Sequence, residues 1–542
     1  MNPRLDRVEL AVLESLLSSC AEEMGVVLMR TAHSPNIKER LDHSCAVFDR
    51  EGRLVAQAAH IPVHLGSLPR AVEIAREQVA IGPGDVVLLN DPFAGGTHLP
   101  DLTTVSGVFI GRSSRADFYL ASRAHHADVG GAAPGSMPLA REVYEEGLRI
   151  PPLRIVHAGR VVEDVMRLVL ANVRTPDERR ADLAAQLGAQ ATGERRLREL
   201  AARCGAARLA RASAALITIG AQRMRAALRV IPRGTWRFED VLDDDGLGAG
   251  PIPIRVAIAR RAGGLRVDFG GTALQTAGPV NAVEAVTRAA VAYAVRCVVG
   301  DVPINHGMFQ PLDVIAPLGS VVNPRPPAAV AAGNVETSQR IVDVVLGALA
   351  RALPGRVPAA SSGTMNNLLI GGRDPRTGLP FAYYETLAGG HGAGPGWNGE
   401  HAMQAHMTNT RNTPVEALEH AYPLRVVATR IRRRSGGRGR WVGGDGIERS
   451  LEMLAPARVT VISERRTRGP YGLAGGEAGS TGSNEVIWPR AARLERGSVR
   501  GGKGSEPLPG KFVVDFPKGA VLTVASSGGG GHGRAARRRV PR

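Results

Sequence analysis

The chain has 542 residues, of which 44% are hydrophobic and 22% charged; this is typical of a folded protein with room for two or more domains. The formal net charge of +17 comes almost entirely from arginine, because only four residues are lysine. The densest arginine clusters are not interleaved with aromatic side chains that could stack on bases, so we expect no nucleic-acid partner.

Cysteine usage and the hydropathy pattern indicate a cytoplasmic protein. Cys20, Cys45, Cys204 and Cys297 form no CxxC pair, which predicts reduced thiols. The N-terminal apolar run carries acidic residues, so we expect no signal peptide. No stretch approaches 18 uninterrupted apolar residues, so we expect no membrane span.

The first 233 residues are expected to form a helix-rich α/β region. Apolar residues recur at helical spacing over 5–29, which predicts a long amphipathic helix. Two alternating runs joined by a short turn predict a β-hairpin over 44–57. Further helices are expected over 68–79 and within the Ala-, Leu- and Arg-rich block 163–230.

Two short strands, expected over 85–89 and 118–121, run into glycine-punctuated loops. The first loop, 90–101, reads NDPFAGGTHLPD, and the second, 122–131, reads SRAHHADVGG. Because both loops leave the ends of strands, we expect them to converge at one edge of a sheet, where sites are commonly built.

These two loops carry the strongest chemical signal in the chain. His98 and Asp101 are three residues apart, and His125, His126 and Asp128 crowd the second loop. Imidazole and carboxylate ligands are typical of a site for a divalent metal such as zinc, manganese or iron, whereas a structural zinc site usually has thiol ligands. The same residues would also serve as turn or capping residues, and no spacing here matches a signature such as HExxH.

After residue 233 the pattern changes to short strands separated by Gly and Pro turns, so we place a domain boundary there and expect a β-rich region over 234–542. Strands are expected over 235–242, 252–259 and 265–270 and again after 421, with helices over 286–299 and 337–353. The predicted fold class is α+β, with mixed sheets, a helix-rich N-terminal region and a β-rich C-terminal region with a basic tail.

Three segments of this second region invite a binding role. The DFGGT sequence at 268–272 resembles the phosphate-binding hairpin of the actin and sugar-kinase superfamily, but partner phosphate loops are not apparent, so we expect a tight turn. The Gly-, His- and Asn-rich loop 389–412 would bind substrate or satisfy its own backbone. Segment 332–338 would hold an anion at the start of a helix, or one of its hydroxyls would cap that helix.

No GxSxG elbow, Walker lysine motif or Cys/His nucleophile pair stands out in the sequence. If the chain is an enzyme, this favours metal-activated water over a side-chain nucleophile.

Many colinear blocks carry a family resemblance. They include RTAHSPNIKERLDHSCAVFD, LLNDPFAGGTHLPDLT, ASRAHHADVGGAAPGSMP, NVRTPDERRADLAAQ, HMTNTRNTPVEALEH and YGLAGGEAG. In these blocks the chain resembles the hydantoinase B/oxoprolinase family. That family includes the B-type components of ATP-dependent N-methylhydantoinases, the C-terminal half of 5-oxoprolinase, and subunits of acetone and acetophenone carboxylases.

The resemblance implies a division of labour within a hetero-oligomer. A hydantoinase A-type ATPase subunit would bind ATP and phosphorylate the substrate. The B-type chain would then open the activated cyclic amide, such as a hydantoin, 5-oxoproline or another lactam or imide. The alternative is a carboxylase subunit that acts on a phosphoenol intermediate. The loop before HMTNT is longer than in related chains, which leaves the substrate open.

The resemblance also implies site residues. The expected metal ligands are Asp42, His98, Asp101 and His125. His126 and Asp128 are expected to act in catalysis or to exchange roles with His125. The expected substrate contacts are Asn90, Arg123, Asn334, His406, Asn409 and Arg411.

Overall fold

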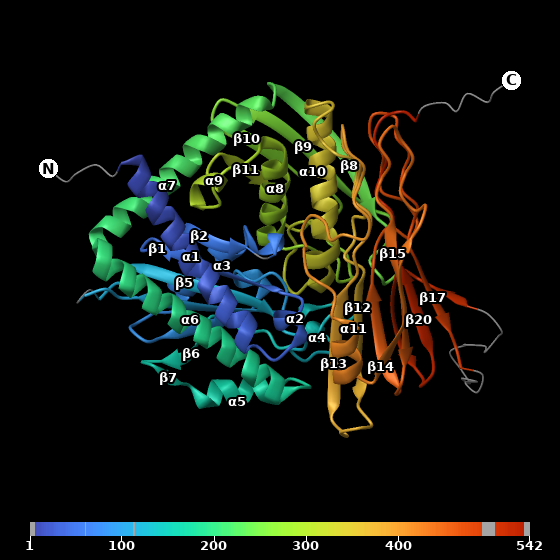
Figure 1. The fold of residues 1–542 in the computed structure, drawn as a ribbon, viewed down its shortest axis with the longest axis horizontal. Helices are drawn as coiled ribbons and strands as arrows, with labels where there is room; N and C mark the ends of the chain where they lie inside the picture. The colour runs from blue at the N-terminus through green and yellow to red at the C-terminus, as the bar shows by residue number, and fades with distance from the viewer. Residues whose placement is uncertain (1–5, 60, 112–113, 490–504, 536–542) are drawn as a thin grey trace.

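The computed structural model describes residues 6–59, 61–111, 114–489 and 505–535 (Figure 1). Within these residues the strands form four sheets, and helices pack between and over them, so the fold class is α+β as predicted. None of the helices among these residues has both the length and the apolar character needed to cross a membrane.

The N-terminal region contains a seven-stranded sheet in addition to its helices. Its strands follow the order β2-β1-β5-β4-β3-β6-β7, and each neighbouring pair is antiparallel. The strands are β1 (His43–Asp49), β2 (Leu54–Ala59), β3 (Val86–Leu89), β4 (Asp101–Val108), β5 (Phe118–His125), β6 (Leu153–His157) and β7 (Arg160–Val161). The predicted hairpin is β1 and β2, and β4 and β5 lie at the centre of the sheet.

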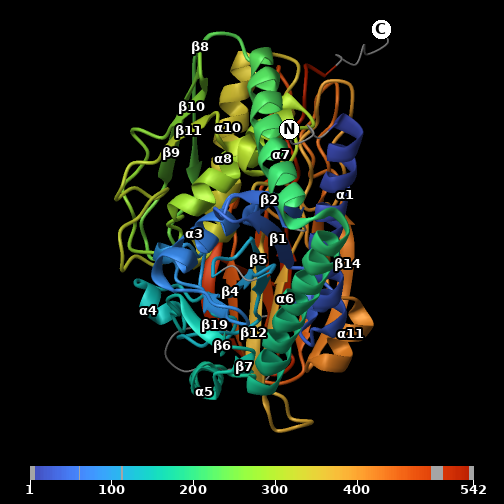
Figure 2. The same ribbon diagram turned by 90° about the vertical axis from the view of Figure 1, so that its left-hand side faces the viewer.

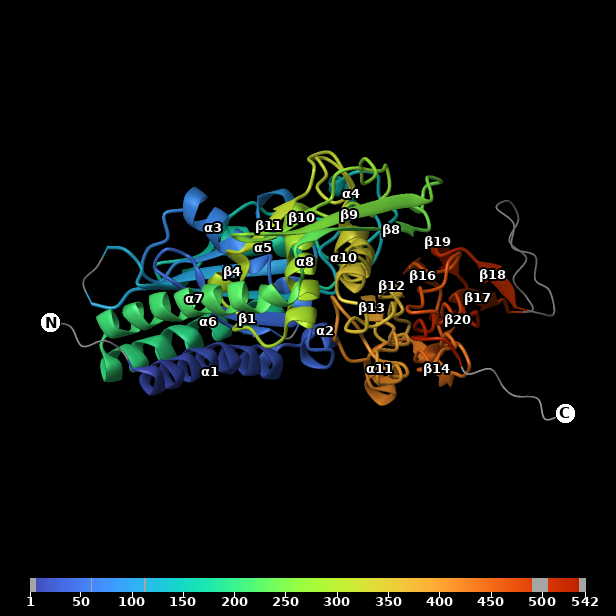
Figure 3. The ribbon, with the colours of Figure 1, turned by 90° about the horizontal axis from the view of Figure 1, so that it is seen from above.

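Long helices cover one face of this sheet, and a shorter helix covers the other. Helices α1 (Arg7–Thr31), α6 (Pro176–Cys204) and α7 (Ala206–Ala227) lie side by side on the first face (Figures 2 and 3). The Asp6 side chain caps α1 by accepting from the Glu9 N–H at 2.7 Å. Helix α3 (Leu68–Gln78) packs on the opposite face. The predicted block 163–230 is divided by turns into α5 (Glu163–Ala171), α6 and α7.

The middle of the chain forms a four-stranded sheet in the order β11-β10-β9-β8. Its elements are β8 (Gly234–Leu242), β9 (Ile252–Arg261), β10 (Gly264–Asp268), β11 (Leu312–Ile315), α8 (Glu284–Val299), α9 (His306–Phe309) and α10 (Ser338–Ala352). Helix α10 is buried along nearly its whole length, because β8 and β9 pack on one side and α8 on another. The DFGGT segment forms the expected turn, in which the Gly270 N–H donates to Asp268 Oδ1 at 2.9 Å.

The C-terminal region consists of two sheets that face each other across a hydrophobic core, with strand orders β13-β12-β16-β19 and β14-β15-β20-β17-β18 (Figure 1). The strands are β12 (Asn367–Arg373), β13 (Pro380–Thr386), β14 (Leu424–Arg432), β15 (Gly446–Met453), β16 (Ala457–Ile462), β17 (Ser483–Ile487), β18 (Glu506–Leu508), β19 (Lys511–Phe516) and β20 (Val521–Ala525). Short helical elements complete the fold: α2 (Pro35–Lys38), α4 (Val143–Glu146), α11 (Val415–Ala421), 3-10 turns Pro62–His64, Pro92–Ala94 and Leu228–Val230, and the π-helical turn Gly333–Thr337. Most of the basic tail lies outside the described residues.

The run of glycines at 528–531 is a buried packing element. A Cβ at Gly529 would lie 1.9 Å from the His391 carbonyl oxygen, which only glycine avoids. The Gly529 N–H donates to the Gly444 carbonyl at 2.9 Å, and the Gly530 N–H donates to the Ala360 carbonyl at 2.8 Å. Glycine-rich segments from distant parts of the chain therefore pack backbone against backbone, which accounts for much of the high glycine content.

Candidate metal centre

The two glycine-punctuated segments converge at one edge of the sheet, as the sequence predicted, but β5 extends to His125, so the first four residues of the second predicted loop belong to the strand. Asp101 opens β4 and pairs in register with His125, which closes β5. His98 precedes Asp101 by one turn, and its Nε2 lies 3.1 Å from Asp101 Oδ1. His125 Nδ1 lies 3.3 Å from the same oxygen. One ligand atom from each of these three residues falls within 4.8 Å of the others.

The loop that presents His98 is held rigidly by its own sequence. The Asn90 amide donates to the carbonyls of Leu99 at 2.7 Å and Leu148 at 2.9 Å, and its oxygen accepts from the Ile150 N–H at 2.6 Å. A Cβ at Gly96 would lie 2.4 Å from the Asn90 carbonyl oxygen, so the chain can fold back here only through glycine. Asn90 is fully used in holding the loop and does not reach substrate space.

A third histidine, His64, also faces Asp101 and was missed from the sequence. Its Nε2 lies 3.6 Å from Asp101 Oδ2, and its Nδ1 lies 3.0 Å from Ser44 Oγ. The Thr97 hydroxyl donates to Asp101 Oδ2 at 2.5 Å. His64 ends a short turn after Pro62, a position that gives no local signal of a ligand.

The electrostatics favour the charge states that bind a divalent cation. Burial acts to raise the pKa of Asp101, but the His98 imidazole and hydrogen bonds from His125 and His64 outweigh it and hold that pKa well below its usual range. Burial lowers the pKa of His125, which keeps its imidazole neutral. An ionised Asp101 carboxylate and a neutral His125 imidazole are the protonation states in which these two residues bind a metal.

A buried ring nitrogen tests whether a metal fits. His98, His125 and Asp101 are each at most 3% exposed. His98 Nδ1 lies 3.3 Å from the Ala331 carbonyl oxygen and its Nε2 faces Asp101, while Nε2 of His125 finds no hydrogen-bond partner among the described residues. Buried polar atoms are seldom left unpartnered, and two imidazoles with one carboxylate are a common ligand set for zinc or non-haem iron that leaves coordination positions open. The residues present therefore fit a divalent metal.

A small cavity of about 20 Å³ adjoins the cluster and has room for about one water molecule. Its lining from the N-terminal region includes Asp42, His64, Asp101 and His125, and its lining from the rest of the chain includes Asn334, Val335, Met365, Tyr384, Thr386, Met407, Thr408 and Thr410. Asp42 thus reaches the site, and its carbonyl oxygen accepts from the His125 N–H at 3.0 Å. The amide oxygen of Asn334 finds no partner among the described residues and is free to accept a hydrogen bond.

A larger cavity of about 520 Å³ lies elsewhere, between the β1–β2 turn, α3 and α8. Its charged lining residues pair with one another, as Arg70 does with Glu73 and Arg288 does with Glu284. The smaller cavity is the better candidate site because two members of the His–Asp cluster, Asp101 and His125, line it.

His126 and Asp128, the expected catalytic residues, lie outside the cavity. His126 Nε2 lies 3.0 Å from Gln186 Oε1 on α6, and burial with the nearby Arg179 lowers its pKa to about 4. Asp128 accepts from the Arg174 backbone N–H at 2.9 Å and from its guanidinium at 2.8 Å. Successive side chains of the chain leaving β5 point in different directions, so only His125 faces Asp101.

Arg123, an expected substrate contact, is committed to the fold. It is fully buried, and its guanidinium donates to Thr103 Oγ1 at 2.8 Å, to Ser67 Oγ at 2.5 Å and to the Gly95 carbonyl at 3.2 Å. Arg123 therefore holds the loop that precedes His98 in place, and it does not line the cavity.

The segment after His401 divides between the cavity and the surface. Asn409 and Arg411 are exposed, whereas Thr408 and Thr410 line the cavity, because an extended chain alternates its side chains. His406 has a left-handed backbone with φ of 58°, burial lowers its pKa to about 3, and its Nε2 lies 3.7 Å from Asp343 Oδ1. Of the six expected substrate contacts, Asn334 alone is among the cavity-lining residues.

The fold and the site together define an α+β protein with a buried His–Asp cluster suited to a divalent metal. The chain belongs to the hydantoinase B/oxoprolinase family, whose model matches residues 6–535.

Relatives extend the comparison over the whole chain. 5-Oxoprolinase 1 of Arabidopsis thaliana is 38% identical over 559 residues, which cover 97% of this chain but 42% of that protein. The putative B-type component of a D-/L-hydantoinase from Pseudomonas sp. (strain NS671) is 28% identical, with 98% of this chain and 90% of that protein covered. The crystal structure of the ATP-dependent caprolactamase from Pseudomonas jessenii superposes with a TM-score of 0.90 at 27% identity, covering 99% of this chain and 93% of that one.

Proposed function

We propose that this chain is the B-type subunit of an ATP-dependent hydantoinase or oxoprolinase, and that it opens a cyclic amide with the help of a divalent metal. The observation that carries the proposal is the buried cluster of His98, Asp101 and His125, in which His125, with its unpartnered Nε2, lines a cavity. Asp42, which lines the same cavity, is proposed as a further ligand. Zinc, manganese and iron all suit this donor set.

A bound metal would polarise the substrate oxygen or lower the pKa of a water molecule towards neutrality. The chain's own residues do the rest. Asp101 stays ionised, and its carboxylate holds the imidazoles of His64, His98 and His125 around it. The free amide oxygen of Asn334 can accept the ring N–H of a lactam or hydantoin. Apolar walls that include Met365 and Met407 exclude bulk water, which strengthens polar contacts inside the cavity.

ATP is assigned to a hydantoinase A-type partner in a cytoplasmic hetero-oligomer. Support comes from the DFGGT segment, which forms an ordinary turn, and from the name of the Pseudomonas relative, which describes one component of a larger enzyme. The Arabidopsis 5-oxoprolinase 1, of which this chain spans about two fifths, is long enough to carry both functions in one polypeptide. On this view the substrate comes to the metal site already activated by phosphorylation, and the cavity, which has room for about one water molecule, has to widen to admit it.

Elemental analysis tests the proposal. We expect about one metal per chain in the purified protein, in keeping with a single three-ligand site. His98→Ala should lose both the metal and lactam-opening activity with the A-type partner, whereas His420→Ala, on the exposed side of α11, should keep them. No metal after incubation with zinc, manganese and iron would refute the proposal, and turnover that required bicarbonate would support the carboxylase alternative.

A further inference from the structure

The two imidazoles of the cluster are oriented in different ways. His98 has a polar partner on its far side, the Ala331 carbonyl at 3.3 Å from Nδ1, as metal-binding histidines usually do. His125 has no carbonyl partner of this kind, because its Nδ1 faces Asp101, itself a proposed ligand, at 3.3 Å, and its Nε2 finds no hydrogen-bond partner among the described residues. Its ring instead stacks on Tyr384, with centroids 4.6 Å apart and planes inclined by 20°.

The Tyr384 ring is itself fixed by a chain of hydrogen bonds. Its hydroxyl donates to Asn367 Oδ1 at 2.9 Å. Asn367 Nδ2 donates to Glu336 Oε1 at 2.7 Å and to the Ile462 carbonyl at 3.0 Å. Both amide hydrogens are therefore used, so the amide oxygen must face the tyrosine and the phenol must be the donor. The Arg40 guanidinium also lies over the ring, 4.6 Å from its centroid.

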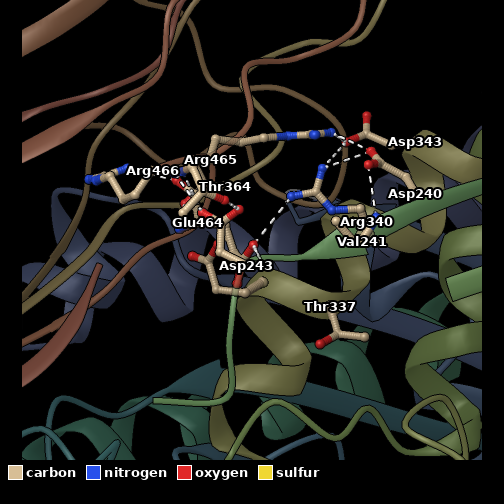
Figure 4. A network of polar contacts seen from close by, with 12 residues as sticks. Asp240, Val241, Asp243, Thr337, Arg340, Asp343, Thr364, Glu464, Arg465 and Arg466 are labelled. Carbon is tan, nitrogen blue, oxygen red and sulfur yellow. Dashed lines mark hydrogen bonds and ion pairs between the residues drawn. The ribbon is translucent and has the colours of Figure 1, made fainter. Parts of the chain in front are cut away.

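Glu336 ends this series of hydrogen bonds and holds Asn367 in place. It lies on the π-helical turn Gly333–Thr337 that leads into α10, and its Oε1 also accepts from the Met365 N–H at 3.1 Å. The carboxyl adjoins a buried polar network that includes Glu464 and Thr364 (Figure 4). In that network the Glu464 N–H donates to Thr364 Oγ1 at 3.1 Å. Burial and Glu464 raise the pKa of Glu336 to about 8, so its neutral form prevails near neutrality.

We propose that Tyr384 is a positioning residue for the metal ligand His125, and that Asn367 and Glu336 hold its ring in place. The proposal rests on the proposed metal site and adds how that site keeps its geometry. Ring stacking supplies for His125 the orientation that a carbonyl supplies for His98. The motif AGNVETS at 332–338 thereby acquires a second role, because its glutamate supports the metal centre from outside the cavity.

A Co²⁺ titration of the full-length, metal-free chain, followed by visible absorption, tests this inference, since the cobalt spectrum reports the geometry of its ligands. Tyr384→Leu should weaken Co²⁺ binding about 10–100-fold, the range for loss of a supporting contact, and should change the spectrum. Glu336→Ala should act in the same direction with a smaller effect. Glu336→Gln should match the wild type, because its amide oxygen can still accept from Met365 and Asn367.

Tyr383→Leu is the matched control. Tyr383 precedes Tyr384 on β13 and is equally buried, but it faces the other side of the sheet and packs on Tyr422 with centroids 5.0 Å apart. It should lower stability and leave Co²⁺ binding unchanged.

The possible outcomes separate this inference from the proposed function. A wild-type chain that binds no Co²⁺ would overturn the metal site itself. A wild-type chain that binds Co²⁺, with the same affinity and spectrum in Tyr384→Leu, would overturn only the positioning role. An equal loss in Tyr383→Leu would show a general packing effect and would also overturn it. If Tyr384→Leu does not fold, the contrast between Glu336→Ala and Glu336→Gln decides the question.

Discussion

Glu146→Gln is expected to stabilise the protein increasingly as the pH rises. Glu146 ends α4 and is fully buried behind the metal centre. One of its oxygens accepts from the N–H groups of Val330 and Ala331, both at 2.8 Å, and the other finds no partner among the described residues. The Ala331 carbonyl in turn orients His98. Glutamine offers the same accepting oxygen and has the shape of the neutral acid.

The magnitude follows from the cost of keeping a buried carboxyl protonated. Burial raises the pKa of Glu146 from its ordinary 4.5 to about 8. A folded-state pKa above the unfolded one means that the stability contributed by this group is fully present below pH 4.5 and is lost as the pH rises towards 8. At about 1.4 kcal/mol per pH unit, the loss reaches roughly 3 kcal/mol at pH 7. Glutamine has no proton to lose, so the variant avoids this loss.

Calorimetric melting of metal-free wild type and variant between pH 5 and pH 8 measures the effect. The melting-temperature difference should be small at pH 5 and should grow in favour of the variant up to about pH 8. Glu163→Gln, at an exposed position in the first turn of α5, should show no trend over this range. A flat difference for Glu146→Gln would mean that the carboxyl is charged in the folded protein, and the reasoning would fail.

Two further outcomes are expected. Gly529→Ala should destabilise the fold by more than about 4 kcal/mol, because its Cβ would overlap the His391 carbonyl, whereas Gly263→Ala, with nothing within 4 Å of the added atom, should melt like the wild type. Asn334→Ala should lower kcat/KM for a lactam about fivefold to tenfold, as the loss of one neutral hydrogen bond does, with metal content intact; unchanged kcat/KM would remove Asn334 from the substrate site.

The sequence pointed to the His–Asp cluster because the signal of that cluster is local. His98 and Asp101 share one turn, and His125 ends the strand that pairs with the one Asp101 begins, so strand ends and loop chemistry were enough to bring them together. His64 was not predicted because it lies on a separate turn, and only the tertiary fold brings that turn close to Asp101.

Five of the six expected substrate contacts do not line the cavity, for a physical reason. Asn90 and Arg123 have side chains that suit substrate binding, but backbone carbonyls and hydroxyls distant in the sequence already take their hydrogen bonds. Asn409 and Arg411 are in the right segment but on its outward face. Composition indicates which side chains can bind a ligand, whereas only the three-dimensional fold shows which of them are still free to do so.

Residues from both sides of the predicted domain boundary near residue 233 line the cavity. The side chains of the His–Asp cluster precede that position, while Asn334, Met365, Tyr384 and Met407, which close the cavity, follow it. A core cluster crosses the boundary in the same way, since Val63 packs in one cluster with Val344. The ligand Asp101 therefore has its partners in one half of the chain, and the positioning ring of Tyr384 belongs to the other. A fragment ending near residue 233 would keep His98, Asp101 and His125 but lose the stacking of His125 on Tyr384, so we expect the proposed metal centre to be ordered only when both halves are present.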